Sequence, residues 1–247
     1  MRPDQGWDAT LAYMLTPEFA EVRELFEAVP EIGGAYFRPL ESGIRVVDLH
    51  PDSPKPLTAV EPGSLVERGA TAHELAPTIP ERVGQLLRVR AEQAKPARDR
   101  RFEARLVRHA LAHGLRLPRP FPPELRFLYS GWRADRLAGK RRQDPADLVA
   151  VDLVTGRLVL VALRVGTSSS AVGQVRAHAD SLSERLAGLA PLFERIAAMM
   201  SELYGCYDLV ELVVDRGGVD GLVATESNGG TITITVTEVS AAAAATA

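Results

Sequence analysis

The sequence predicts an α/β fold with a sheet that is buried on both faces at its centre. Two apolar runs, Asp147–Val154 and Arg157–Val165, are joined by a tight turn at Thr155-Gly156. Their near-continuous leucine and valine content is typical of strands in the middle of a covered sheet. Apolar residues at helical spacing before and after this pair predict the helices that would cover it.

Length and composition are those of a globular protein. The chain has 247 residues, of which 46% are hydrophobic and 25% charged, enough for one large domain or two small ones. No apolar run approaches the roughly 18 to 20 residues that a membrane helix needs, and the N-terminus lacks the apolar centre of a signal peptide. The single cysteine, Cys206, excludes an internal disulfide. We therefore expect a cytoplasmic protein without a membrane partner.

Positive charge is concentrated in one stretch, although the net charge of the chain is −3. Between Arg82 and Arg142 lie 17 of the 29 Lys and Arg residues and only 5 acidic residues. This concentration favours DNA or another nucleic acid as partner, because Lys and Arg near a phosphate backbone release its counterions. The alternative interpretation is that the arginines only keep helices solvated, and the count does not decide between the two.

The first region, residues 1–77, is predicted to be a small α+β region of unknown role. Thr16–Glu18 supplies an N-cap, a proline at the first helical position and an early acid. Ala35–Leu40 and Ile44–Leu49 predict two strands of a hairpin. Residues 51–62 are punctuated by prolines and are expected to be irregular.

The second region, residues 78–240, contains the paired strands. Thr78–Glu81 has the spacing of a capping box and predicts the start of a helix. Val172 is among the residues of a later helix that we expect to face the sheet. The alanine-rich tail, residues 241–247, is expected to be disordered. The remaining elements are expected at Arg98–His113 (helix), Leu125–Trp132 (strand), Ala171 to about Leu186 (helix), Pro191–Tyr204 (helix), Asp208–Asp215 (strand) and Thr231–Val239 (strand).

The paired strands and the helix after them resemble the core of the PD-(D/E)XK nucleases. In that family an Asp opens the second core strand, and an acid and a lysine two positions apart lie on the third. Here Asp147 opens the second strand, while Ala162 and Arg164 occupy the two positions on the third. Gln174 resembles the glutamine at the start of the next helix in many members. The resemblance implies a restriction-endonuclease-like core over residues 78–240, with a central mixed sheet flanked by helices.

The two replaced positions are those on which hydrolysis of a phosphodiester depends in this family. Hydrolysis of a phosphodiester by such a site needs a metal held by carboxylates and a water made nucleophilic. Residues two apart on a strand point to the same face. Ala162 and Arg164 therefore occupy the two positions that, in the family, hold the metal and activate the water. Ala162 cannot bind a metal, and Arg164 stays protonated, unlike a lysine that orients or deprotonates water. Our first hypothesis is a nucleic-acid-associated protein with impaired cleavage and a degenerate site of Asp147, Arg164 and Gln174.

Arg164 could serve this protein in two ways. It could contact a phosphate near the old scissile position, or it could pair with Asp147 as a charge-assisted link. The residues that we expect to contact the nucleic-acid backbone are Arg101, Arg105, Arg108, Arg133, Lys140, Arg141 and Arg142.

Two further hypotheses stay open. In the second, Asp147 and Glu103 hold Mg²⁺ together with water molecules, and the chain is an active divergent endonuclease. In the third, the chain is an interaction or structural module that kept the fold without its ligand. The first and third hypotheses require no metal cofactor, and the sequence leaves a homodimer open.

Overall fold

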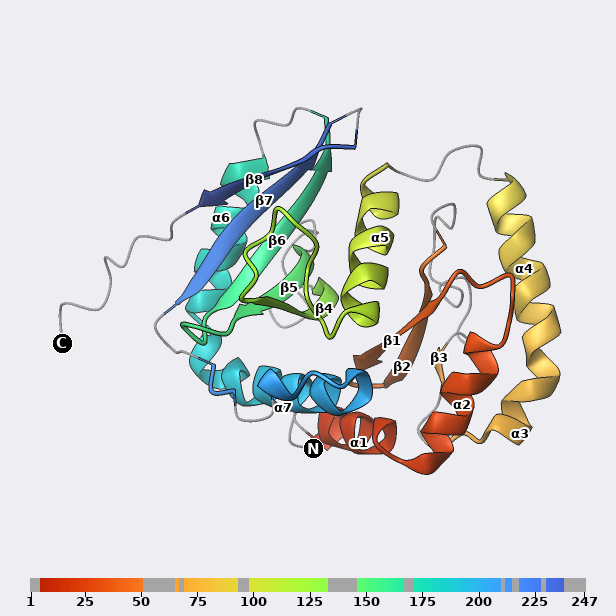
Figure 1. The fold of residues 1–247 in the computed structure, drawn as a ribbon. Helices are drawn as coiled ribbons and strands as arrows, with labels where there is room; N and C mark the ends of the chain where they lie inside the picture. The colour runs from red at the N-terminus through yellow and green to blue at the C-terminus, as the bar shows by residue number, and fades with distance from the viewer. Residues whose placement is uncertain are drawn as a thin grey trace. The chain divides into compact units, whose positions relative to one another are not determined.

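The computed structural model divides the chain into two compact units, Met1–Arg108 and His109–Ala247 (Figure 1). The structure describes residues 5–50, 65–66, 69–92, 98–132, 146–166, 171–209, 212–214, 218–227 and 230–237. The division falls inside one continuous helix and therefore marks no linker. The boundary after residue 77 thus stays a prediction. The expectations for residues 51–62 and 241–247 lie outside the described residues.

Helices and a small antiparallel sheet make up the first unit. Thr16 caps α2, its hydroxyl accepting a hydrogen bond from the Phe19 N–H at 3.3 Å. The predicted hairpin is confirmed as β1 and β2, and β3 pairs with β2. The elements are α1 (Gln5–Met14), α2 (Pro17–Glu27), β1 (Ala35–Leu40), β2 (Gly43–Asp48), β3 (Leu65–Val66), α3 (Ala72–Leu75), α4 (Ile79–Glu92) and most of α5 (Arg98–Ala112).

The helix start predicted at Thr78–Glu81 is confirmed, because α4 begins at Ile79, but the capping box of this unit lies at Thr71 and Glu74. The Thr71 hydroxyl accepts from the Glu74 N–H at 3.3 Å, and the Glu74 carboxylate accepts from the Thr71 N–H at 2.9 Å. The hydrogen bonds that the Glu74 carboxylate accepts from the Thr71 N–H and the Thr71 hydroxyl lower the pKa of Glu74. Thr78 instead donates its hydroxyl to the Leu75 carbonyl at 2.8 Å. The same Thr-x-x-Glu spacing occurs twice in close succession, and the first copy forms the cap.

A five-stranded mixed sheet organises the second unit. Its strand order is β4-β5-β6-β7-β8, in which β6 and β7 run parallel and the other neighbours run antiparallel. The elements are β4 (Leu125–Trp132), β5 (Ala146–Asp152), β6 (Leu158–Val165), α6 (Ala171–Ser183), α7 (Leu186–Tyr204), β7 (Val219–Glu226) and β8 (Ile232–Thr237). The α/β class and the mixed sheet flanked by helices are therefore confirmed.

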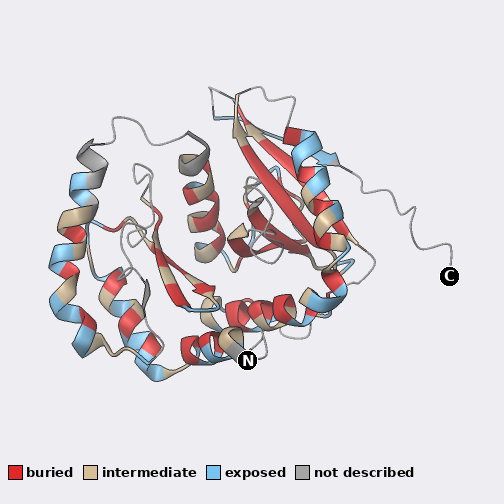
Figure 2. Cartoon of the chain, turned by 180° about the vertical axis from the view of Figure 1, so that it is seen from behind, coloured by how far each residue is buried: buried red, intermediate tan, exposed pale blue. Residues whose placement is uncertain are grey.

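The centre of this sheet is buried, as its composition predicts. Residues 148–151 of β5 and 158–163 of β6 are all buried (Figure 2). Helix α6 packs on β6 and β7 through a face that includes Val175 and Ala179. Val172 was expected on that face but is 38% exposed. It follows the buried Ala171 by one residue, which on a helix is a turn of about 100° away from the sheet.

The strand predicted at Asp208–Asp215 is wrong for the residues of this segment that the structure describes. Tyr207–Leu209 forms a 3₁₀ helix, residues 212–214 belong to no strand, and Val213 is 75% exposed. The strand parallel to β6 is β7, where Asp220 and Gly221 interrupt the apolar pattern. Composition alone therefore favoured the wrong valine-rich segment.

Helix α7 was also predicted to begin too late. It begins at Leu186 and contains Pro191, which was expected to be its first residue. Leu186 and Ala190 are fully buried and extend its apolar face toward the N-terminus.

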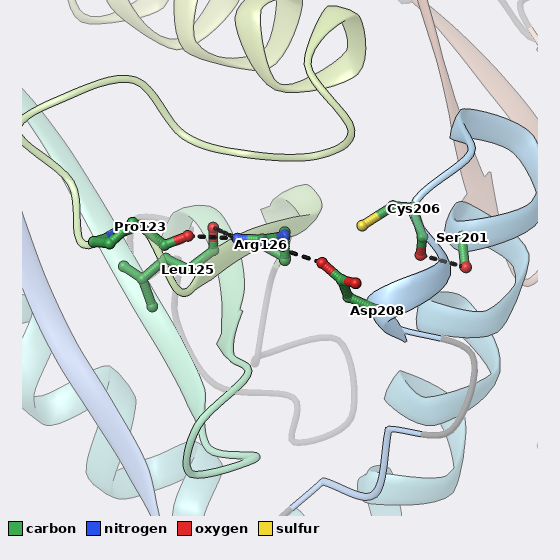
Figure 3. A network of polar contacts seen from close by, with 6 residues as sticks. All are labelled: Pro123, Leu125, Arg126, Ser201, Cys206 and Asp208. Carbon is green, nitrogen blue, oxygen red and sulfur yellow. Dashed lines mark hydrogen bonds and ion pairs between the residues drawn. The ribbon is translucent and has the colours of Figure 1, made fainter.

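A buried arginine connects β4 to the segment after α7 (Figure 3). Arg126 is 4% exposed, and its guanidinium donates to the carbonyls of Pro123 at 2.6 Å and Leu125 at 3.3 Å and to Asp208 at 3.2 Å. Cys206 lies beside this network, and burial raises the pKa of its thiol. Arg126 is therefore a structural residue, although it lies in the basic stretch of the sequence.

Substitutions of Arg126 and Asp208 should lower the free energy of unfolding by different amounts. Arg126→Met leaves the Pro123 and Leu125 carbonyls without this donor and removes a buried guanidinium, so we expect the free energy of unfolding to fall by about 2 to 4 kcal/mol. The Asp208 side chain is 57% exposed, and an exposed partner contributes little, so Asp208→Asn should cost about 1 kcal/mol or less. Urea denaturation of both variants measures the difference. Equal losses would contradict the structural role of Arg126.

Candidate functional site

The two strands of the central hairpin bring the sequence-predicted positions onto one face. Leu148 pairs with Val161, and continuing this antiparallel register by one residue places Asp147 opposite Ala162. Residues that lie opposite each other in an antiparallel pair share a face. Arg164, two residues after Ala162, lies on that face as well.

Arg164 makes the contacts that define the site. One guanidinium nitrogen lies 3.2 Å from a carboxylate oxygen of Asp147 and 2.6 Å from the Leu163 carbonyl. The other donates to the side-chain oxygen of Gln174 at 3.2 Å. The same Asp147 oxygen accepts from the Leu163 N–H at 2.7 Å. Arg164 thus bridges Asp147 on β5 and Gln174 on α6, and the predicted pairing with Asp147 is present.

Because the Arg164 bridge is partly buried, its hydrogen bonds contribute to the free energy of unfolding. The side chains of Arg164 and Asp147 are 21% and 22% exposed, while Gln174 is exposed. Charge-assisted hydrogen bonds that are partly shielded contribute more than an exposed pair, on the order of 1 to 3 kcal/mol before screening by solvent. The Gln174 contact is the weaker end because water competes for both groups.

The backbone of Leu163 is the part of the site that sequence reasoning missed. Its N–H and its carbonyl contact the two ends of the ion pair. No side-chain pattern signals this contribution, since every residue except proline carries the same backbone groups. The alternation of β6 could have indicated it, because Leu163 lies between Ala162 and Arg164.

The residues on this face do not fit a magnesium site. Ala162 is 6% exposed and offers a methyl group where the resemblance calls for an acid. A guanidinium lies against the one carboxylate that remains, and a second cation there would be repelled. In the part of the chain that the structure describes, no group of three or more His, Cys, Asp or Glu side chains could hold a metal.

The other predicted ligand lies on a different unit. Glu103 belongs to α5 and to the first unit, whereas Asp147 belongs to the second. Joint binding of Mg²⁺ by Glu103 and Asp147 therefore stays a prediction. Asp152, at the far end of β5, accepts from the N–H groups of Val154 at 2.8 Å and Thr155 at 3.4 Å and stabilises the hairpin turn.

The predicted nucleic-acid contacts differ in their surroundings. On α5, Arg105 is exposed and its guanidinium lies 5.7 Å from the centre of the Phe102 ring, while Arg101 is half-buried. Arg108 donates to the Leu49 carbonyl, so part of its hydrogen-bonding capacity stabilises the first unit. The other predicted contacts, Arg133, Lys140, Arg141 and Arg142, lie outside the described residues.

Comparisons of the chain with family models, curated proteins and solved structures found no match. Its class therefore rests on its own geometry: an α/β protein with a five-stranded mixed sheet flanked by helices. Among the described residues, no helix combines the length and the apolar character needed to cross a membrane.

A double-mutant cycle tests whether the bridge is an energetic unit. We expect Arg164→Ala to lower the free energy of unfolding by about 1 to 3 kcal/mol, and its coupling with Asp147→Ala to be about 1 kcal/mol. Urea denaturation of the two single variants and the double variant measures both. Arg176→Ala, at an exposed position on the same helix as Gln174, is the control and should change stability by less than about 0.5 kcal/mol. Additive losses at Asp147 and Arg164 would contradict the bridge.

Proposed function

We propose that this chain is a nucleic-acid-associated protein with a restriction-endonuclease-like core that has lost metal-dependent cleavage. The observation that carries the proposal is the position of the Arg164 guanidinium, which spans Asp147 and Gln174. A nuclease of the PD-(D/E)XK type would need a metal cation on this face. In this chain the positive charge on this face is the guanidinium of Arg164.

The placement of the site residues supports the fold assignment within this proposal. Asp147 is the second residue of β5, the middle one of three strands that pair antiparallel in succession. Ala162 and Arg164 lie on β6, the third, and Gln174 lies in the first turn of α6. These are the positions that the resemblance assigns to the motif aspartate, the acid, the lysine and the helix glutamine.

The chemistry of the site supports the loss of cleavage. Arg164 carries a guanidinium, which is a poor general base and is not suited to take a proton from water. It also neutralises Asp147, which removes the attraction that a divalent cation would need. What remains is a partly exposed guanidinium, which can donate hydrogen bonds to a phosphate without hydrolysing it.

The distribution of charge supports nucleic acid as the partner. The stretch from Arg82 to Arg142 is strongly basic in an otherwise acidic chain. Arg126 is buried and takes no part, but Arg88, Arg105 and Arg116 are exposed among the described residues. Exposed arginines of this kind bind a phosphate backbone without regard to sequence.

Nuclease assays test the loss of cleavage. Plasmid, linear and single-stranded DNA, and RNA, should remain intact with Mg²⁺ or Mn²⁺, because Ala162 cannot bind a metal and Arg164 is a poor base. Cutting that depends on metal and disappears in Asp147→Ala would contradict the proposal and favour the active-nuclease hypothesis.

Restoring the motif is the reciprocal test. The double change Ala162→Glu with Arg164→Lys supplies a second carboxylate and a lysine on the Asp147 face, so we expect Mn²⁺ to raise the Tm of the variant by a few degrees. The wild-type protein should show no such shift, and Arg164→Lys alone is the control. A double variant that folds but ignores Mn²⁺ would argue against the fold assignment.

Nucleic-acid binding should depend strongly on salt. We expect the affinity for duplex DNA, measured by fluorescence anisotropy, to fall as NaCl rises, and Arg105→Glu to lower it about three- to tenfold. Arg176→Glu, an exposed arginine outside the basic stretch, is the matched control and should bind as the wild type does. Absence of binding, or affinity that does not change with salt, would contradict the nucleic-acid role and favour the interaction-module hypothesis.

A further inference from the structure

The two edges of the five-stranded sheet differ in their protection. At one edge, Arg116 forms an isolated bridge with Arg126 of β4, and the Phe127 N–H donates to the Leu115 carbonyl at 2.8 Å. At the other edge lies β8, and within the described residues no strand pairs with its outer side. An edge of this kind presents backbone donors and acceptors that another strand can pair with.

The hydrogen bond that closes the β7–β8 hairpin shows which residues point outward. The Ser227 N–H donates to the Thr231 carbonyl at 2.9 Å, so Thr231 directs its backbone toward β7. In an antiparallel ladder, successive residues direct their backbone groups to opposite sides. Ile232, Ile234 and Val236 therefore direct their N–H and carbonyl groups toward the open edge.

The sequence of this strand is self-complementary. Residues 231–237 read Thr-Ile-Thr-Ile-Thr-Val-Thr, which is nearly the same in both directions about Ile234. The strand contains no charge and no proline, the features that commonly protect an edge. Thr233 and Thr235 are exposed, and Val236 is 61% exposed.

We propose that β8 pairs antiparallel with β8 of a second copy of this chain, with the two-fold axis at Ile234. In this register Ile232 faces Val236, Ile234 faces its own counterpart, and Thr233 faces Thr235. Every pair then joins residues of like character, as a self-complementary two-fold interface requires. The sheets of the two copies become continuous.

The ladder selects this register over its neighbours. Only residues that direct their backbone outward can form bonded pairs, so each shift moves the strands by two residues. A shift in either direction leaves an outward-directed residue at the end of the strand without a partner. The register centred on Ile234 engages Ile232, Ile234 and Val236 of both copies.

The interface rests on one short strand pair, which sets its strength. Stable dimers commonly bury about 1,200 to 2,000 Å² in total, and a single pair of strands lies near or below the low end of that range. We therefore expect a dimer that dissociates on dilution, with a Kd on the order of micromolar. The inference is independent of nuclease-like function.

Sedimentation analysis of the full chain over a range of concentrations tests the proposal. The mass should approach twice the 26.7 kDa of the monomer as concentration rises. Ile234→Pro removes an N–H that points to the open edge and spares the β7–β8 ladder, so it should weaken association at least tenfold with little change in Tm. A wild-type chain that stays monomeric up to about 0.5 mM, about 500-fold above a Kd of about 1 μM, would overturn the proposal.

A charge exchange at Ile234 tests the register. Ile234→Lys and Ile234→Glu each place like charges opposite each other at the two-fold axis and should each be monomeric. An equimolar mixture of the two should associate, because the introduced ammonium then faces the introduced carboxylate. Association that survives in either single variant, or a mixture of folded monomers that does not associate, would overturn the pairing at Ile234. Circular dichroism checks that each variant is folded.

Discussion

Burial of the β5–β6 hairpin on both faces is the constraint on which the second unit depends. Residues 148–151 and 158–163 have no room for polar side chains, since each polar group buried there would need a partner. Charged residues are therefore confined to the strand ends. Antiparallel pairing then brings the start of β5 next to the end of β6, which is where Asp147 and Arg164 meet.

The same constraint explains why the two notable arginines of this unit have different roles. Arg126 is the second residue of β4, is 4% exposed and donates mainly to carbonyls of its own segment. Arg164 lies at the end of β6, stays partly exposed and joins two elements through side chains. A basic residue count does not separate these cases. Burial does, because the Arg164 side chain is 21% exposed whereas Arg126 is 4% exposed.

The sequence predicted the elements whose pattern is set by local chemistry. Thr16 caps its helix, β4 has the predicted bounds, and the pairing of Arg164 with Asp147, one of the two roles left open for Arg164, is present. It failed where two segments competed for one role. Thr71 and Thr78 carry the same capping spacing, and the segments at 208–215 and 219–226 are both rich in valine and leucine. Tertiary packing decided each case, and no local pattern records that decision.

We propose that the Arg164 guanidinium lies where a nuclease of the PD-(D/E)XK type would hold a metal. A crystal structure of the wild-type protein grown with millimolar Mn²⁺ and measured at a wavelength near the manganese edge tests it most directly. We expect Arg164 to lie between Asp147 and Gln174, with no anomalous peak within bonding distance of the Asp147 carboxylate. A manganese peak on that carboxylate, with Arg164 displaced, would contradict it.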